Sequence, residues 1–237
     1  MADFFIYMFA ILLNNVIKDL TQHLPKISVI MAVYNTDFIF VKRAIDSVLK
    51  QSFQNFSLIV VDDGSDYDPE QKLLRYIAPF KHKITYLHHL NCGQSQSINK
   101  AILQSESEFV TILDSDDEYE PNHLQACLNE MLNADLIAST TKTIVDKEED
   151  YFVPDKFNRS ISIHVDDCIL FATLFGKREV FTTLKFHDSY AADAHFYERA
   201  AEQFKVKKVN LRTYIYYRNN PNSICAKMKN TNFVLVA

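Results

Sequence analysis

Apolar and polar residues alternate in blocks from Ile27 onward, and these blocks predict strands and helices in turn. Short apolar runs rich in β-branched residues are typical of strands buried on both faces of a sheet, and we expect them at 27–33, 57–61, 83–87, 109–113 and 135–140. The segments between them have apolar residues at helical spacing, and we expect helices at 37–50, 69–77, 94–104 and 121–132, with Pro121 in the first turn of the last. Such alternation is typical of βαβ units and predicts a mainly parallel sheet with helices on both faces.

The pattern is weaker after the fifth predicted strand. Residues 146–160 are expected to form an exposed loop, and the apolar residues 168–175 fit either a strand or a helix. A helix is expected over 190–204 and a strand over 212–218. The sequence contains no repeat, low-complexity tract or clear linker, so we expect residues 25–237 to form one domain.

The first 24 residues form an apolar extension that includes FFIYMFAILL at 4–13. This run is too short to span a bilayer, which needs about 20 residues. It is preceded by Asp3 and by no basic residue, and no small-residue cleavage site follows, so it does not fit a signal peptide. We expect a helix packed on the domain, with a helix that docks on a membrane or partner as the alternative. The predicted location is the cytoplasm, with peripheral contact at the cytoplasmic membrane face left open.

Composition excludes several classes of protein. Twenty-five basic and 30 acidic residues give a net charge of −5, without a basic tract, so nucleic acid is not an expected partner. Four scattered cysteines are expected to be free thiols in a reducing compartment. With only three glycines, the chain has neither a GxGxxG fingerprint nor a P-loop.

Several carboxylates gather directly after the fourth predicted strand, in Asp114-Ser115-Asp116-Asp117. Like charges this close raise one another's pKa and are costly unless a cation lies between them. Carboxylate oxygens suit Mg²⁺ or Mn²⁺, and Mg²⁺ is usually shared between protein carboxylates and substrate phosphates. The segment therefore indicates a metal-bridged diphosphate ligand. The alternative is helix capping, which is the expected role of Glu118 and Glu120.

Polar residues also follow two other predicted strands, at Tyr34-Asn35 and at Asp62-Asp63. Ligands of parallel sheets bind at the carboxyl ends of the strands, so we expect these groups to meet the acidic segment in one crevice. A carboxylate at 62–63 could accept a hydrogen bond from a nucleotide base. The alternative is an ordinary Asp-Gly turn.

A further carboxylate, Asp193, lies near the start of the helix predicted at 190–204. A general base must be held rigidly beside the proton that it removes, and a helix start can hold a side chain in this way. The alternative is an acid that caps the helix or lies in its first turn. Asp188, His195 and Glu198 are rival bases nearby.

Together these residues resemble the family-2 glycosyltransferases with the GT-A fold. The matching segments are PKISVIMAVYN, VKRAIDSVLKQSFQNFSLIVVDDGS, NCGQSQSINKAI and FVTILDSDDEYEPNHLQ, and the likeness continues more loosely in LFGKREVF, AADAHFYERAAE and YIYYRNNPNSI. The resemblance implies an α/β, Rossmann-like GT-A fold with a mixed, mainly parallel sheet. It also implies a nucleotide-binding half at 25–118 and an acceptor-binding half at 119–237. The implied reaction transfers one sugar, with inversion, from a nucleotide-diphosphate sugar, favouring a UDP-sugar, to a hydroxyl of a glycan or lipid-linked saccharide.

The resemblance also implies roles for particular residues. Ala32, Tyr34 and Asp63 match positions that line the base and nucleoside pocket, with Asn35 beside them. Asp114 and Asp116 match positions that hold the ribose and the diphosphate. Mn²⁺ or Mg²⁺ is expected on Asp116 or Asp117. Asp193 matches the catalytic base.

Some features depart from the family pattern. Ser97 stands where the family often has an arginine, and Ala192-Asp193 replaces a Glu-Asp pair. The chain has no tryptophan, so the QxxRW motif of processive members is absent, which favours single-sugar transfer. Acceptor contacts are expected in the weakly patterned region 141–185, which contains His164, Asp166 and Asp167.

Two alternative functions are a catalytically silent module that binds a nucleotide-sugar or a partner, and a nucleotidyltransferase. The latter is disfavoured because VYNTDF after the first strand is neither glycine-rich nor basic.

Overall fold

The structure is a computed structural model that describes residue 6 and residues 24–66, 69–158, 160–189 and 191–220. Apart from Ile6, the helix predicted at residues 4–13 lies outside the described residues.

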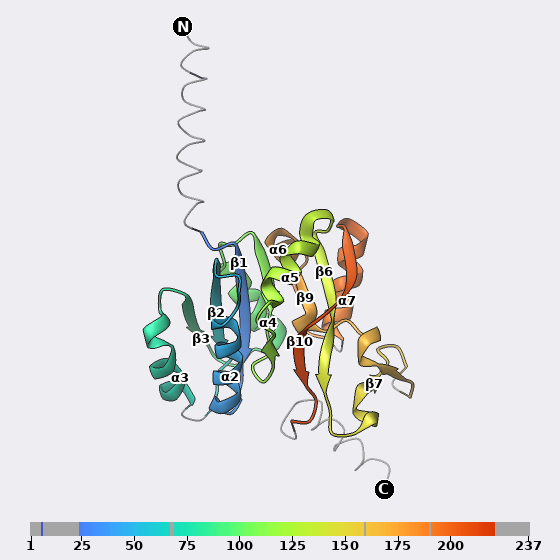
Figure 1. The fold of residues 1–237 in the computed structure, drawn as a ribbon, viewed down its shortest axis with the longest axis horizontal. Coiled ribbons are helices and arrows are strands. Elements are labelled where there is room, and N and C mark those ends of the chain that lie inside the picture. Colours follow the sequence, from blue (N-terminus) through green and yellow to red (C-terminus); the bar gives the residue numbers. More distant parts are fainter. Residues whose placement is uncertain (1–5, 7–23, 67–68, 159, 190, 221–237) are drawn as a thin grey trace.

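A parallel block of four strands forms one half of the main sheet (Figure 1). Its members are β1 (Ile27–Val33), β2 (Phe56–Asp62), β3 (Ile84–His88) and β4 (Phe109–Ile112). They lie in the order β3-β2-β1-β4, and every neighbouring pair is parallel. The sequence predicted all four within one residue at either end.

The other half of the sheet is mixed. Strand β9 (Leu174–Lys177) lies antiparallel between β4 and β6 (Leu136–Ile144). Strand β10 (Val206–Tyr217) is parallel to β6, and the short β5 (Glu118–Tyr119) pairs antiparallel on its outer edge. The complete order is β3-β2-β1-β4-β9-β6-β10-β5, which confirms the predicted mixed, mainly parallel sheet.

Helices cover both faces of this sheet. Helices α2 (Phe38–Leu49), α3 (Pro69–Ile77) and α5 (His123–Glu130) contribute to one hydrophobic core. Helices α4 (Gln94–Gln104), α6 (Arg178–Leu184) and α7 (Ala192–Gln203) contribute to the other. Successive strand side chains point to opposite faces, so β1 places Val29 and Met31 in the first core and Ile30 in the second.

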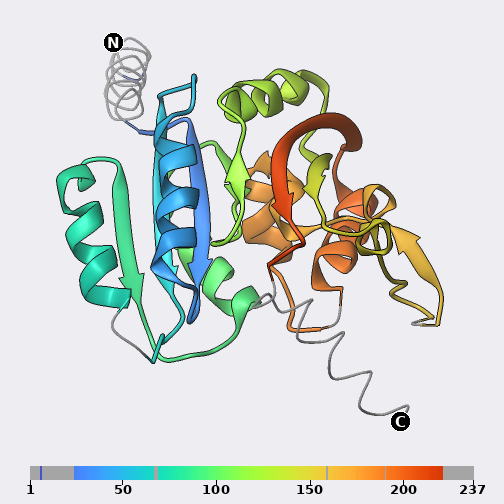
Figure 2. The same cartoon turned by 60° about the horizontal axis from the view of Figure 1, so that its bottom comes forward.

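Short elements connect these units. The 3-10 helices are η1 (Ala78–Phe80), η2 (Met131–Asn133), η3 (Glu148–Tyr151), η4 (Val165–Asp167) and η5 (Phe171–Thr173). The segment 146–160, predicted to be an exposed loop, contains η3 and β7 (Phe152–Pro154). This strand pairs with β8 (Ser162–His164) in a small hairpin on the side of the molecule away from β3 (Figures 1 and 2). The loop prediction was wrong because three-residue strands give too short an alternation to detect.

Several other boundaries differ from the predictions, and strand β6, for example, ends at Ile144, four residues beyond the strand predicted at 135–140. Helix α5 starts at His123 after Asn122, so Pro121 precedes the helix. The segment 168–175 contains η5 and the start of β9. Strand β10 begins six residues before the predicted strand and contains an irregularity between Val209 and Tyr214, which interrupts the sequence alternation.

Candidate functional site

Hydrogen bonds join the three polar segments at the carboxyl edge of the parallel strands, as the sequence predicts. The backbone N–H of Asn35, after β1, donates to Ser65 Oγ after β2 at 3.1 Å. The hydroxyls of Thr36 and Ser115 are 2.8 Å apart and connect the loop after β1 to the loop after β4. These contacts join the strand ends into one polar surface.

The loop after β1 exposes an aromatic ring beside a strained residue. Tyr34 is 49% exposed, whereas Ala32 lies partly buried in β1. Asn35 has φ 51°, in the left-handed region that asparagine tolerates better than most residues. Its side-chain amide exchanges two hydrogen bonds with Asp66, which hold this conformation.

Both carboxylates after β2 are buried and hydrogen-bonded. Asp62 accepts from the N–H and hydroxyl of Ser65 and from the Tyr86 hydroxyl at 2.9 Å. Asp63 accepts from the N–H groups of Cys92 at 2.8 Å and Gly93 at 3.0 Å. Asp62 therefore closes its own turn, whereas Asp63 ties β2 to the start of α4.

Asp114 is the first carboxylate of the acidic segment. Gln94, in the first turn of α4, donates to its Oδ1 at 3.0 Å. Burial, together with the charges of Asp116 and Asp193, raises the pKa of Asp114 to about 7. Asp193 is 79 residues further along the chain, so the fold brings the predicted base and the predicted metal motif together.

The last two aspartates of the segment differ in environment. Asp116 is partly exposed and accepts from the Asn220 side chain at 2.9 Å. Asp117 is 1% exposed, and its oxygens accept from the Tyr214 hydroxyl at 2.7 Å and the Tyr217 N–H at 2.8 Å. Burial and the charges of Asp114 and Asp116 raise the pKa of Asp117 well above its ordinary value. Asp117 is therefore held against β10, whereas Asp116 stays partly exposed.

Tyr214 connects both ends of the acidic segment. Its hydroxyl oxygen donates to Asp117 and also accepts the backbone N–H of Asp114 at 3.3 Å. Tyr214 is fully buried, and its ring meets Tyr119 edge-to-face at 5.7 Å. On the other side of the segment, Arg43 in α2 donates to the backbone carbonyl of Asp116 at 2.5 Å. The strand β10 and the helix α2 thus fix the loop that presents the carboxylates.

Helix capping does not explain the acidic residues. Glu118 lies in β5, where it pairs with Arg43 and accepts from the Tyr217 hydroxyl. Glu120 pairs with Lys142 at 2.8 Å, and the cap residue of α5 is Asn122. The predicted capping role of the two glutamates was wrong because β5 intervenes between the acidic segment and the helix.

Asp193 lies in the first turn of α7 and is held by backbone donors. Its oxygens accept from the N–H of Phe171 at 3.2 Å and from Ala194 at 2.8 Å, and burial raises its pKa. The N-cap residue of α7, Ala191, has φ 55°, a conformation that costs an alanine roughly 1–2 kcal/mol. Strain of this kind is often found where a side chain must be held in one orientation for function.

The rival bases have other partners. Asp188 accepts from Gln96 at 3.0 Å. Glu198 forms an ion pair with Lys156 and lies 3.5 Å from His195. The side chains of Glu198 and His195 are both about half exposed. Among these groups, only the charge of Asp193 contributes to the raised pKa of Asp114.

The polar residues expected to contact an acceptor lie around the small hairpin. His164 stacks on Tyr151 with centroids 5.5 Å apart, and its Nδ1 accepts from the Asp166 N–H. Asp166 pairs with Arg212 at 2.5 Å, and Asp167 is exposed. Their role toward an acceptor stays a prediction.

A cavity of about 560 Å³ lies between α2 and β5, lined by Phe40, Arg43, Glu118 and Tyr119, among others. None of the eight residues predicted for catalysis, nucleotide or metal lines it. The convergent carboxylates, rather than this cavity, define the candidate active site.

Sequence reasoning missed the residues that support the site, chiefly Tyr214, Gln94 and Arg43. The alternation in RTYIYYR predicts a strand around Tyr214, but the identity of its neighbours depends on strand order. Cys92, Cys127 and Cys168 are free thiols, as predicted, and Cys225 lies outside the described residues.

The mixed, mainly parallel sheet is that of the GT-A fold, and the comparisons with known proteins agree. Residues 28–202 match Glycosyl transferase family 2, so the chain belongs to this family. A relative from Escherichia coli K12, WcaA, named as a glycosyl transferase of colanic acid biosynthesis, is 37% identical over 106 residues. These cover 44% of this chain and 37% of WcaA.

Solved structures share the fold at lower identity. Staphylococcus aureus TarS residues 1–349, in complex with UDP-GlcNAc, match with TM-score 0.65 and 21% identity over 85% of this chain and 60% of that chain. The mannosyltransferase PcManGT from Pyrobaculum calidifontis, in complex with GDP-Man and Mn²⁺, matches with TM-score 0.66 and 17% identity over 87% and 60%.

The chain spans between 14% and 60% of the length of the curated relatives that it matches. Within the described ranges, no helix is both long and apolar enough to cross a membrane.

Proposed function

We propose that this chain transfers a single sugar from a nucleotide-diphosphate sugar to an acceptor hydroxyl, with inversion and with a divalent metal. The observation that carries the proposal is that the buried Asp114, at the carboxyl end of β4, has its pKa raised by the charges of both Asp116 and Asp193. The acidic segment and Asp193 come from distant parts of the chain. Together they suit a reaction that needs a metal ion at the leaving group and a base beside the nucleophile.

The residues present fit a hard divalent cation. Asp114 and Asp116 offer carboxylate oxygens, and the raised pKa of Asp114 reflects repulsion that a cation would relieve. Both oxygens of Asp117 already accept hydrogen bonds from β10, so we assign Asp116 as the metal ligand and Asp117 as its support. A bound Mn²⁺ or Mg²⁺ would supply positive charge to the departing diphosphate.

The donor nucleoside is proposed to bind against the ends of β1 and β2. The exposed ring of Tyr34 offers a face for the base, with Ala32 and Asn35 beside it. Asp63 uses its oxygens for two backbone N–H groups, but an ionised carboxylate has about four acceptor directions, which leaves room for a base N–H. The solved relatives with UDP-GlcNAc and GDP-Man support a nucleotide-sugar donor, and we favour a UDP-sugar.

Asp193 acts as the general base. As the acceptor oxygen bonds to the anomeric carbon, the bond from that carbon to the diphosphate breaks, and the acceptor proton passes to an Asp193 oxygen. Burial raises the pKa of Asp193 and makes it a stronger base than a free aspartate. The two backbone N–H groups that hold its oxygens keep it oriented toward the acceptor.

The acceptor is proposed to be a glycan or lipid-linked saccharide of the cell surface, bound near 141–185. A colanic acid relative supports a role in polysaccharide synthesis. The proposed location is cytoplasmic, with contact at the inner membrane face through residues 1–24 as a further proposal.

Nucleotide binding tests the donor site. Thermal unfolding is followed with UDP and GDP, with and without Mn²⁺, for the wild type and Asp116→Asn. One nucleotide should stabilise the wild type by about 2.7 kcal/mol at a hundredfold excess over its Kd, and only with Mn²⁺. Asp116→Asn should lose this effect, whereas the control Glu120→Gln, which breaks only the pair with Lys142, should keep it. Stabilisation that persists without Mn²⁺ or in Asp116→Asn would contradict the assignment.

The alternative of a silent binding module predicts nucleotide binding without turnover. Hydrolysis or transfer from any nucleotide-sugar donor excludes it.

A further inference from the structure

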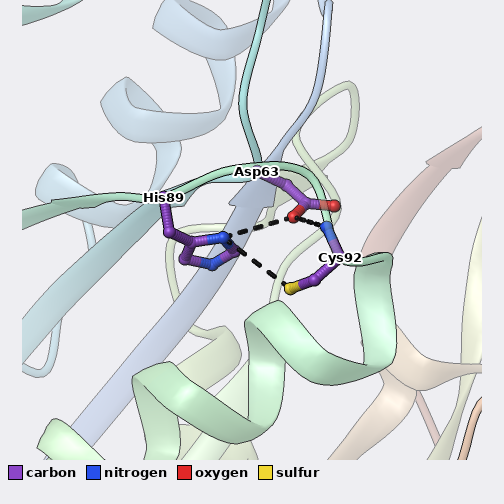
Figure 3. Close-up of side chains that lie close together, drawn as sticks. All are labelled: Asp63, His89 and Cys92. Atoms are coloured by element: carbon purple, nitrogen blue, oxygen red, sulfur yellow. Dashed lines mark hydrogen bonds and ion pairs between the residues drawn. The ribbon is translucent and has the colours of Figure 1, made fainter.

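A second cluster of metal-binding groups lies beside the proposed nucleoside pocket (Figure 3). It comprises Asp63 after β2, His89 after β3 and Cys92 before α4. One ligand atom from each residue lies within 4.8 Å of the others. His89 Nδ1 is 3.5 Å from Asp63 Oδ1 and 3.7 Å from Cys92 Sγ.

These distances match the edges of a tetrahedral zinc site. With Zn–N and Zn–O bonds of about 2.0–2.1 Å and Zn–S of about 2.3 Å, ligand atoms in a tetrahedron lie roughly 3.3–3.6 Å apart. The two separations from His89 Nδ1 therefore need adjustments of only a few tenths of an ångström, and the Asp63 carboxylate and the Cys92 thiol lie within 4.8 Å of one another. A thiolate, an imidazole and a carboxylate together also suit zinc better than Mg²⁺ or Mn²⁺.

Neighbouring groups orient two of the three ligands. The Asp63 side chain is 5% exposed and accepts the N–H groups of Cys92 and Gly93. His89 Nε2 lies 3.3 Å from the hydroxyl of the fully buried Ser97. A hydrogen bond from the second imidazole nitrogen to an oxygen is the usual support of a metal-bound histidine.

The loop that carries His89 is packed tightly onto the turn after β2. Gly64 has φ 78°, and a Cβ at this position would lie 2.6 Å from the backbone nitrogen of Asn91 and 3.1 Å from the carbonyl oxygen of His89. Only glycine permits this approach, so the backbone fixes His89 opposite Asp63.

Charge and proton balance are compatible with a dication. The Asp63 carboxylate and a Cys92 thiolate would offset the two charges of Zn²⁺. In this structure the exposed Lys100 is 3.2 Å from Cys92 Sγ, and His89 Nδ1 is 2.8 Å from the Leu90 carbonyl. Binding would displace the ammonium, release the thiol proton to solvent and leave the imidazole proton on Nε2, facing Ser97.

We propose that Asp63, His89 and Cys92 bind Zn²⁺, with a fourth position open to water or a ligand. The site is distinct from the acidic segment and selects a thiophilic metal. Because Asp63 also belongs to the proposed nucleoside pocket, bound Zn²⁺ would weaken donor binding; this consequence rests on the proposed function.

Cobalt spectroscopy on the full chain, freed of metal by a chelator, tests the site. Titration with Co²⁺ should give one equivalent of a tetrahedral spectrum with a thiolate-to-cobalt charge-transfer band, which Zn²⁺ then abolishes. Cys92→Ser should lose the charge-transfer band, whereas the control Cys168→Ser, at another partly buried thiol, should keep it. Absence of the band in the wild type, or its persistence in Cys92→Ser, would overturn the proposal.

A subtler variant separates metal support from folding. Ser97→Ala removes one hydroxyl from the fully buried side chain and should weaken Co²⁺ binding by about 10- to 100-fold at unchanged circular dichroism. Unchanged affinity would overturn the role of His89 as an oriented ligand. Nucleotide binding by the wild type is measured separately, so its absence would count against the proposed function and not against the zinc site.

Discussion

The two halves of the sheet differ in how they are built, and the proposed active site includes residues from both. Strands β1 to β4 form a regular parallel block whose loops supply Asp63 and Asp114. The half from β5 to β10 is held by long-range pairings and supplies Asp193 and the support of Asp117. The groups proposed to bind the donor thus come from the half with a regular local pattern. The proposed base and the supporting Tyr214 come from the half that long-range strand pairing assembles.

The largest effect is expected at the base, which belongs to the second half. Asp193→Asn should lower kcat roughly 100- to 10,000-fold while nucleotide binding is retained, because no base remains to take the proton from the hydroxyl of the sugar acceptor. Initial rates and nucleotide titrations measure this split. Asp188→Asn is the matched control and should keep most of the activity, and full activity of Asp193→Asn would refute the assignment.

The next largest effect is expected at the junction of the two halves, where β9 lies between β4 and β6. Gly176 in β9 pairs with Val110 of β4 and Leu136 of β6, and an added Cβ would lie 2.8 Å from the Asp135 carbonyl oxygen. Gly176→Ala should therefore destabilise the fold by about 1–3 kcal/mol. Urea unfolding measures the loss, and an unchanged midpoint would show that the junction yields without cost.

Tyr214→Phe tests how β10 supports the acidic segment. Removal of the hydroxyl takes away the hydrogen-bond partner of Asp117 Oδ2 and of the Asp114 N–H, while Asp117 Oδ1 keeps the Tyr217 N–H. This loss should cost about 1–3 kcal/mol and weaken Mn²⁺-dependent nucleotide binding. Tyr76→Phe removes a phenol-to-carboxylate bond to Asp46 in the first half and is the matched control, for which a smaller stability loss and unchanged binding are expected. Equal nucleotide binding by the wild type, Tyr214→Phe and Tyr76→Phe would show that the Tyr214 hydroxyl does not support the site.

The smallest effect concerns acid stability. Burial lowers the pKa of His123 from 6.5 to about 3, and the ring lies 3.9 Å from that of Tyr119. Between these pH values the unfolded chain binds a proton that the folded chain does not, so His123 should reduce stability by roughly 1 kcal/mol for each pH unit of acidification.

The slope of stability against pH is measured by thermal unfolding between about pH 4 and pH 7, a range in which an unfolded histidine titrates. His123→Phe should have a flatter profile than the wild type, and the exposed His82→Phe should match the wild type. An identical slope in His123→Phe would show that another group dominates.

The sequence predicted the first half closely because each strand is a short buried run followed by an amphipathic helix. Boundaries of β1 to β4 and of α4 follow from local pattern alone. The strands β5, β7 and β8 have only two or three residues, too few to show a period. In β10, the irregularity before Tyr214 interrupts the alternation that would otherwise have extended the prediction.

Residue types and their positions at strand ends determined the candidate chemistry: a row of carboxylates, a divalent cation and a nucleotide diphosphate. Tertiary structure decided how those carboxylates divide their roles. Asp117 accepts hydrogen bonds from the buried Tyr214 and from Tyr217, and the charge of Asp193 raises the pKa of Asp114. These interactions form because the fold brings together segments that are 79 to 100 residues apart. Local sequence encodes periodicity and turn chemistry, whereas burial and the partners of a charge depend on contacts that form only when distant strands pair.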